Sequence, residues 1–347
     1  MNTFISCLLV IFCCQISFGQ KNNEEEKPEP PAFKIVRAEE SYLFLKEKEN
    51  NPYKNELLDG IKFIPLTKNK EAYLSLGGQI RTRFEHYSNR LWINEVDQDF
   101  YSQRISIHSN IVFNKNLRVF GELFHGYTSH EREFTEFDQL NIHQAFIDFK
   151  FPLKKSSISF RFGRQEMGLG ASRLVGIREG PNIRRSFDQG RFIYKSGKTI
   201  IQAFYGKEVS PVFGTFNNEF SLFDNQAPNP ELWGGYSQFK IKGLIGLNEV
   251  YYLGFQSDNA RFGDVTGREI RHSIGIRRFG TSGERWQYNT EVIYQFGTIG
   301  NSNISAFDIE SDWHYKLINT PWQPRPGIKL QYTSGDNNLN DGTVNTF

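Results

Sequence analysis

The chain has 347 residues, of which 38% are hydrophobic and 15% are aromatic. Phe occurs 32 times and Gly 30 times against only 2 Met, a profile that suits strands and tight turns and argues against an all-helical protein. Beyond residue 19 the sequence has no apolar run long enough for a membrane helix, although a transmembrane barrel, whose signal per segment is weak, stays open. The formal net charge of +2 gives no indication of nucleic-acid binding.

Residues 1–19 form a short apolar stretch that ends in Ser-Phe-Gly and predict a cleaved secretory signal. The alternatives are a buried N-terminal helix and a lipoprotein signal, but Phe12 is too large for the small residue expected before a lipidated cysteine. All three cysteines, Cys7, Cys13 and Cys14, lie in this stretch. The mature chain is therefore predicted to have no disulfide, no thiolate nucleophile and no cysteine metal ligand.

The organisation after the signal is predicted from composition and periodicity. Residues 20–33 are charged and Pro-rich and predict a disordered spacer. Residues 34–70 carry scattered apolar residues and are expected to form a periplasmic lead-in segment. Residues 71–347 are expected to form the main domain, because alternation of apolar and polar residues begins there.

Alternation is clearest in residues 73–87, where Leu74, Leu76, Ile80 and Phe84 fall on one face and polar residues on the other. Thirteen segments are predicted to be strands. They are residues 73–87, 102–113, 117–127, 142–151, 157–165, 191–195, 199–207, 236–240, 249–255, 269–279, 286–296, 304–315 and 327–333.

Segment length and aromatic placement favour an antiparallel transmembrane β-barrel of the outer-membrane type over a soluble sandwich. Several segments have the roughly ten residues that a tilted membrane strand needs, and Tyr, Phe and Trp gather near segment ends. Short connections such as residues 114–116 and 280–283 alternate with long ones such as 129–138, 167–185 and 208–232. The residues expected to face lipid include Leu74, Leu76, Ile80, Ile105, Ile107, Ile274 and Ile276.

Arginine recurs on the polar face of separate predicted strands, at Arg81, Arg83, Arg104, Arg118, Arg161, Arg191, Arg271 and Arg277. In a barrel these side chains would line one lumen and favour anions. The alternative is that they pair with interior acids to fill the space. The candidate acids are Glu85, Glu122, Asp148, Glu166, Asp188 and Glu291.

Enzymatic and metal sites find little support. No nucleophile-elbow, HExxH or P-loop motif occurs, and Ser106 and His108 are interpreted as polar lumen residues without an oxyanion donor. Residues 336–342 resemble a calcium loop but lack the bidentate Glu, so a polar loop with at most weak calcium affinity is expected. We therefore predict a non-enzymatic protein without a cofactor or a metal site.

Several segments together resemble the alginate export family of bacterial outer-membrane barrels. They follow the family order over residues 57–347. The matching segments are residues 58–66 (LDGIKFIPL), 73–85 (YLSLGGQIRTRFE), 163–170 (GRQEMGLG), 184–191 (RRSFDQGR), 271–277 (RHSIGIR), 291–297 (EVIYQFG) and 334–342 (SGDNNLNDG).

The resemblance implies an eighteen-stranded barrel in the outer membrane of a Gram-negative bacterium, through which a uronic-acid polysaccharide such as alginate is exported past an arginine constriction. Because the chain stops where the family continues for several strands, a truncated product with about 13 strands is expected. Outer-membrane lipid, small anions and periplasmic export proteins are the other expected partners. The alternatives are a structural or secretion-associated barrel without specific transport and, more distantly, an outer-membrane enzyme. The motifs carry over Arg81, Arg83, Arg164, Arg191, Arg271 and Arg277 as pore residues, with Glu85, Glu166, Asp188 and Glu291 as their partners.

Overall fold

A computed structural model describes residues 28–47, 53–54, 56–89, 92, 97–129, 136–224, 229–338 and 341–347. The chain divides into two compact units, Met1–Asp59 and Gly60–Phe347. The predicted signal and most of the predicted spacer lie outside the described residues. No helix in the part of the chain that is described is both long and apolar enough to cross a membrane.

The first unit contains two single turns of 3-10 helix, η1 (Arg37–Glu39) and η2 (Leu43–Leu45). Glu40 ties the turns together, because its carboxylate pairs with Arg37 at 3.0 Å and accepts a hydrogen bond from the Tyr42 hydroxyl at 2.8 Å. Burial, reinforced by the hydrogen bond to Glu40, raises the pKa of Tyr42. The boundary between the units falls within α2 (Asp59–Lys62).

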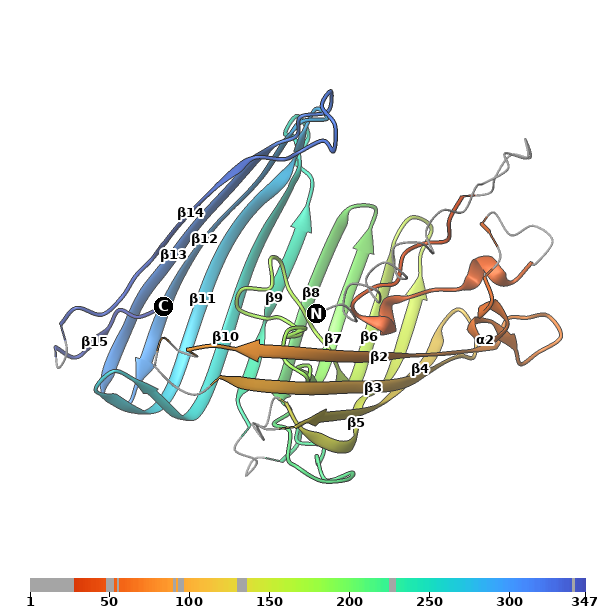
Figure 1. Ribbon diagram of the computed structural model, residues 1–347, viewed down its shortest axis with the longest axis horizontal. Coiled ribbons are helices and arrows are strands. Elements are labelled where there is room, and N and C mark those ends of the chain that lie inside the picture. The colour runs from red at the N-terminus through yellow and green to blue at the C-terminus, as the bar shows by residue number, and fades with distance from the viewer. Residues whose placement is uncertain are drawn as a thin grey trace, which may run out of the picture. The chain divides into compact units, whose positions relative to one another are not determined.

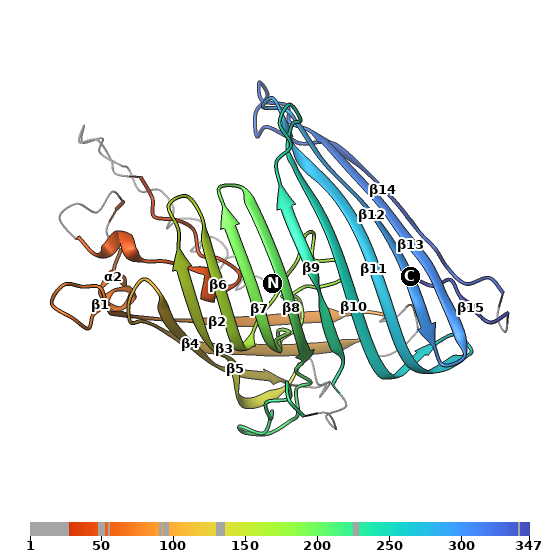
Figure 2. The ribbon, with the colours of Figure 1, turned by 180° about the vertical axis from the view of Figure 1, so that it is seen from behind.

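The second unit is one curled sheet whose strands follow one another in chain order (Figures 1 and 2). Every neighbouring pair from β1 to β14 is antiparallel, and only β15 adds in parallel, to β13. The strands are β1 (Ile64–Pro65), β2 (Tyr73–Tyr87), β3 (Gln98–Val112), β4 (Leu117–Thr128), β5 (Asp138–Pro152), β6 (Ser157–Gln165), β7 (Phe187–Ser196), β8 (Thr199–Glu208), β9 (Glu231–Phe239), β10 (Leu247–Phe262), β11 (Val265–Ser282), β12 (Trp286–Ile299), β13 (Ser302–Tyr315), β14 (Gly327–Thr333) and β15 (Thr343–Val344).

The thirteen segments predicted from alternation correspond to β2 through β14, so the all-β antiparallel prediction is confirmed. The strands are often longer than predicted. β10, for example, continues to Phe262 past a bulge between Ser257 and Ala260, where the pairing register shifts and alternation is lost. Among the described residues the sheet is an open path, with β14 paired only to β13 and the small β1 beside β2.

The two faces of the sheet have the opposite polarity to a water-soluble protein. On β2 and β3 the outward side chains of Ile80, Phe84 and Ile107 are 73%, 69% and 64% exposed. The inward side chains between them are polar and buried, as Arg104 and Ser106 show. The same alternation exposes Ile274 and Ile276 on β11, while Leu74, Leu76 and Ile105 are partly exposed. An outer surface of this kind suits hydrocarbon and not water.

Aromatic side chains gather on the outer face at the end of the sheet where the turn between β11 and β12 lies. Trp286 and Trp313 are half exposed there, and Trp286 packs edge-on against Tyr315 at a centroid distance of 4.8 Å. Not every aromatic residue of the strands faces outward, because Tyr251 on β10 faces inward and is buried. The aromatic side chains at this end of the sheet, Trp286 and Trp313 among them, therefore lie on the outer face, as an interfacial aromatic belt requires.

In the first half of the sheet, long connections lie at one end and short connections lie at the other. Residues 166–186 and 209–230 are long connections at one end, whereas residues 113–116 and 153–156 are short ones at the other. The predicted alternation of short and long connections stops at β10. The β10–β11 connection is only Gly263 and Asp264, and Gly263 has φ of 55°, which suits a two-residue hairpin turn.

Candidate functional site

Residues 166–186, which join β6 to β7, lie against the inner face of the sheet, and we call them the inner segment. Its apolar side chains Met167, Leu169 and Val175 are buried in one cluster with inward residues of five strands. Those inward residues are Phe187, Phe204, Leu232, Tyr236, Tyr251, Leu253 and Ile293. Hydrophobic packing therefore fixes this connection on the inner face.

One row of inner residues runs across β10 to β13 and is mainly acidic. The strand register places Glu249 opposite Arg277, Arg277 opposite Glu291, and Glu291 opposite Glu310. Arg277 donates to Glu249 at 3.0 Å and to the Asn289 side chain at 2.6 Å. The other two carboxylates of this row, those of Glu291 and Glu310, therefore pair with cations from outside the row.

Arg173 of the inner segment is one of these cations. Its Nε donates to Glu291 at 2.5 Å, and its Nη1 donates to Glu310. The hydrogen bond to Glu310 raises the pKa of Arg173, which stays charged. The Tyr251 hydroxyl also donates to Glu291, at 2.8 Å, and crosses over Gly275 to do so. A Cβ at Gly275 would lie 2.0 Å from the Tyr251 ring, so this position requires glycine.

A second set of charges lies on β2 and β3 and is basic, because the register places Arg81 directly opposite Arg104. The inner segment neutralises this pair as well. Arg104 donates to the Glu179 carboxylate at 2.7 Å and to the carbonyl oxygens of Asn182 and Pro181 at 2.9 Å. Arg81 donates to the Glu179 carbonyl oxygen at 2.7 Å.

Arg83 belongs to the same basic patch. It pairs with Glu85 at 2.7 Å and donates to the Gly180 carbonyl oxygen at 2.7 Å. Its Nη2 lies 3.5 Å from Oε2 of Glu136, a residue that precedes β5. Burial raises the pKa of Glu136, although Arg83 opposes the shift.

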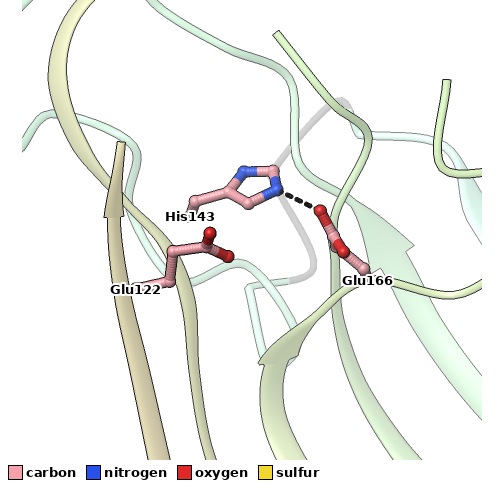
Figure 3. Close-up of side chains that lie close together, drawn as sticks. All are labelled: Glu122, His143 and Glu166. Carbon is pink, nitrogen blue, oxygen red and sulfur yellow. Dashed lines mark hydrogen bonds and ion pairs between the residues drawn. The ribbon is translucent and has the colours of Figure 1, made fainter. Parts of the chain in front are cut away.

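The base of the inner segment is held by a buried cluster of Glu122, His143 and Glu166 (Figure 3). His143 Nε2 lies 2.8 Å from Glu166 Oε1, and Arg184 Nη2 donates to Glu166 Oε2 at 2.8 Å. His143 faces inward because the register between β4 and β5 shifts after Glu122, so two successive residues of β5 point to the same side. The cluster therefore joins the two ends of the inner segment to each other and to the sheet.

The same three side chains have potential metal ligands within 4.8 Å of one another. A divalent cation there would have to displace the hydrogen bonds of Glu166 to His143 and Arg184, and the bond of 2.7 Å from Gln144 to Glu122. These bonds already satisfy the cluster. The expectation that the protein has no metal site stays a prediction, and so does the weak calcium affinity of residues 336–342, of which 339–340 are outside the described ranges.

Two further rows cross the middle of the sheet and differ in charge. In the first, Arg164, Asp188, Lys207 and Glu231 stand opposite one another on β6 to β9, so the signs alternate. This row lies on the outward face of the strands, because Asp188 and Glu231 directly neighbour the inward Phe187 and Leu232. Arg164 binds Asp188 with two nitrogens at 2.7 and 3.0 Å and also donates to the Glu219 carbonyl oxygen. This row is electrically balanced.

The second row consists of Arg118, Asp148, Arg161 and Arg191 on β4 to β7. Asp148 accepts from Arg118 at 2.8 Å and from Arg161 at 2.9 Å, so one carboxylate serves two guanidiniums. Arg161 stands directly opposite Arg191, which donates to the Gln202 side-chain oxygen at 2.8 Å. Three guanidiniums and one carboxylate therefore share this row, and we call it the cationic row.

Eleven of the thirteen residues predicted to line a pore lie on inward strand positions or at the base of the inner segment, whereas Arg164 and Asp188 lie on the outward face of β6 and β7. Arg271 is a buried inward residue of β11. It pairs with Glu269 at 2.5 Å and donates to Gln295 at 2.6 Å. Glu166 and Glu291 were predicted to pair with the pore arginines. In the structure Glu166 binds His143 and Arg184, and Glu291 binds Arg173 and Tyr251. Ser106 and His108 are buried inward residues, and His108 stacks on Phe120.

Sequence reasoning missed Arg173, Glu179 and Arg184 as charged residues of the interior. They lie in a connection without alternation, so no periodicity assigned them to a face. A usable signal was present in the apolar residues Met167, Leu169 and Val175 of the same connection, because a solvent loop has little reason to carry them.

An antiparallel sheet with an apolar outer face, an outer aromatic belt and a charged, buried inner face defines an outer-membrane β-barrel type of protein. The alginate export family model matches residues 72–347, and the chain belongs to that family. No curated protein matches the chain. The family consists of outer-membrane channels for polysaccharide export, and the all-β fold agrees with an outer-membrane location.

Proposed function

We propose that the lumen of this protein prefers anions and that its substrate is an acidic polysaccharide. The observation that carries the proposal is the cationic row, in which three guanidiniums, those of Arg118, Arg161 and Arg191, share one row with the single carboxylate of Asp148. The acidic row of β10 to β13 and the basic patch of β2 and β3 are instead contacted by charged side chains of the inner segment. The predicted pore residues other than Arg164 and Asp188 are proposed to line the lumen as well.

A row of guanidiniums suits a uronic-acid polymer for a geometric reason. Guanidinium groups bind carboxylates through two parallel hydrogen bonds, and they remain charged at every physiological pH. Because the three arginines lie on neighbouring strands, a polymer carboxylate could pass from one to the next. Transport also requires that each site release its ligand, and Asp148 weakens each contact by competing for Arg118 and Arg161.

The effect on small ions can be estimated from Coulomb's law. A guanidinium about 7 Å from a passing monovalent anion contributes roughly 0.6 kcal/mol in a water-like dielectric. Three such groups, less the opposing charge of Asp148, favour the anion by about 1.2 kcal/mol, roughly eightfold in occupancy, before salt screening reduces the effect.

The test is the reversal potential of the channel in planar bilayers under a KCl gradient. The unmodified protein should favour chloride over potassium. The triple variant Arg118→Gln, Arg161→Gln, Arg191→Gln should lose that preference, whereas Arg285→Gln, which removes a cation beside the outer Tyr315, should keep it.

Two outcomes would contradict the proposal. An unmodified channel without chloride preference would favour the alternative of a structural barrel without specific transport. A triple variant that folds, shown by heat-modifiable gel mobility, and still prefers chloride would mean that these arginines only fill the interior.

A further inference from the structure

We infer that Arg81, Arg104 and Arg184 form a preformed carboxylate-binding site and that the Glu179 side chain occupies it until a carboxylate of the substrate takes its place. The inference rests on the proposed function for the nature of the ligand, a uronate carboxylate. It adds a second binding position, separate from the cationic row, with its own internal competitor.

The site brings three guanidiniums to one carboxylate. Glu179 Oε1 lies 2.7 Å from Arg104 Nη1 and 3.8 Å from Arg81 Nη1, and Glu179 Oε2 lies 3.1 Å from Arg184 Nε. Arg81 and Arg104 come from β2 and β3, and Arg184 comes from the end of the inner segment next to β7. A carboxylate at this point therefore accepts a hydrogen bond from Arg104 on one oxygen and lies within ion-pair distance of Arg184 on the other.

The guanidiniums are fixed independently of the Glu179 carboxylate. Arg104 is fully buried and is also held by the carbonyl oxygens of Pro181 and Asn182, and Arg184 is held by Glu166. Arg81 is held by the carbonyl oxygens of Glu179 and Pro181. If the Glu179 side chain rotated away while its backbone stayed in place, these bonds would persist and the site would remain formed.

The Glu179 side chain itself is far less enclosed than the groups it binds. It is 41% exposed, whereas the side chains of Arg104 and Arg184 are 0% and 3% exposed. The carboxylate thus reaches its site from the open side of the inner segment. A soluble carboxylate can approach from that side and replace it without opening the hydrophobic cluster.

This arrangement explains why a channel for a polyanion would keep an acid on an arginine site. Three clustered guanidiniums without a counter-charge repel one another and would hold a polyanion too tightly to release it. A tethered carboxylate covers the cluster between substrates and competes with each bound uronate. Glu179 would therefore weaken binding and speed release, whereas Arg81, Arg104 and Arg184 provide the binding.

The experiment is calorimetric titration of the full-length protein in detergent with trigalacturonate as the probe. Glu179→Gln removes the competing charge and should tighten binding about tenfold, the size expected when a charge-assisted hydrogen-bonded competitor is lost. The matched control is Glu208→Gln. It removes a carboxylate of β8 that pairs with Arg185 of the inner segment at 2.9 Å. The control should bind as the unmodified protein does.

A purely structural role of Glu179 predicts another pattern, in which Glu179→Gln lowers the thermal midpoint and leaves affinity unchanged or weakens it. That result would overturn the inference. Adding Arg81→Gln to Glu179→Gln should abolish the gain, and this residue is chosen because its side chain is 22% exposed and tolerates replacement better than buried Arg104. A gain that survives Arg81→Gln would place the probe elsewhere and also contradict the inference.

The bilayer recordings and these titrations together separate this inference from the proposed function. If the proposed function fails, the unmodified channel shows no chloride preference in bilayers. If only the present inference fails, chloride preference is intact and the cationic-row variant still lowers affinity for trigalacturonate, but Glu179→Gln binds as the unmodified protein does.

Discussion

Replacing Arg173 by alanine is expected to loosen the inner segment from β12 and β13. Arg173 is the one cation that this segment places between Glu291 and Glu310, and the two carboxylate side chains are only 2% and 4% exposed. Removing one partner of a buried ion pair typically costs about 3–5 kcal/mol, because the other charge is left buried without it.

Two contacts lower that figure here. The Tyr251 hydroxyl still donates to Glu291 at 2.8 Å, and Lys329 still pairs with Glu310 at 3.2 Å. We therefore expect Arg173→Ala to reduce the free energy of opening of the inner segment by about 2–3 kcal/mol. The apolar cluster of Met167, Leu169 and Val175 remains, so the sheet itself should stay folded.

Hydrogen–deuterium exchange measured by mass spectrometry on peptides within residues 167–180 gives this quantity directly. A loss of about 2–3 kcal/mol accelerates exchange by roughly 30- to 150-fold when opening is the limiting equilibrium. Arg173→Lys keeps the charge but loses the two-pronged geometry, so its effect should be intermediate.

The matched control is Arg185→Ala in the same segment. The Arg185–Glu208 pair is 24% and 23% exposed, and pairs of this kind contribute about 0–1 kcal/mol. If Arg173→Ala exchanges no faster than the unmodified protein, or no faster than Arg185→Ala, then Arg173 does not hold the segment and the reasoning is wrong.

The remaining predictions concern pH, the outer face and one buried amide. Because burial raises the pKa of Glu136 above 4.5, its ionised form is disfavoured in the folded protein, and stability present below pH 4.5 is lost as the pH rises through the raised pKa. The thermal midpoint of the unmodified protein minus that of Glu136→Gln should therefore be lower at about pH 7.5 than at about pH 4. A difference between the two midpoints that does not change with pH would refute this. Ile107→Arg on the outer face should cost about 2–4 kcal/mol in urea unfolding from lipid vesicles if it lies near the bilayer midplane, whereas Ile107→Leu should change little. Asn182→Ala removes an amide that donates to the carbonyl oxygens of Gln103, Tyr127 and Glu136 at 2.9, 3.1 and 3.0 Å, so urea unfolding should show a loss of about 1–3 kcal/mol. A loss no larger than that of Asn114→Ala in an exposed turn would contradict it.

The strands and their faces could be predicted because both depend on a local pattern. Side chains of a strand alternate between two faces, so the spacing of Leu74, Leu76 and Ile80 against Arg81 and Arg83 already separates an apolar from a charged surface. The pattern failed where the backbone departs from regular pairing. The bulge beside Glu122 turned His143 inward, and the irregularity after Ser257 hid the end of β10.

The pairing of the charges depended on the order and register of the strands. Alternation put Arg118, Asp148, Arg161 and Arg191 on the inner face, but only hydrogen-bonded register placed them in one row. The same register made the Glu249 row acidic. A sequence gives the composition of a face, whereas the sum of charges at one level of the lumen requires the positions of several strands at once.

By itself, the sequence determined an all-β antiparallel sheet with an apolar outer face and arginines on the inner one, because a two-residue period is local. Only the tertiary structure decided that the connection of residues 166–186 lies on the inner face, with Arg173 on Glu291 and Glu310 and with Glu179 on Arg104. Those contacts join residues 118, 137 and 75 positions apart. No local pattern encodes them, since the curl of the sheet and the burial of Met167, Leu169 and Val175 bring the partners together.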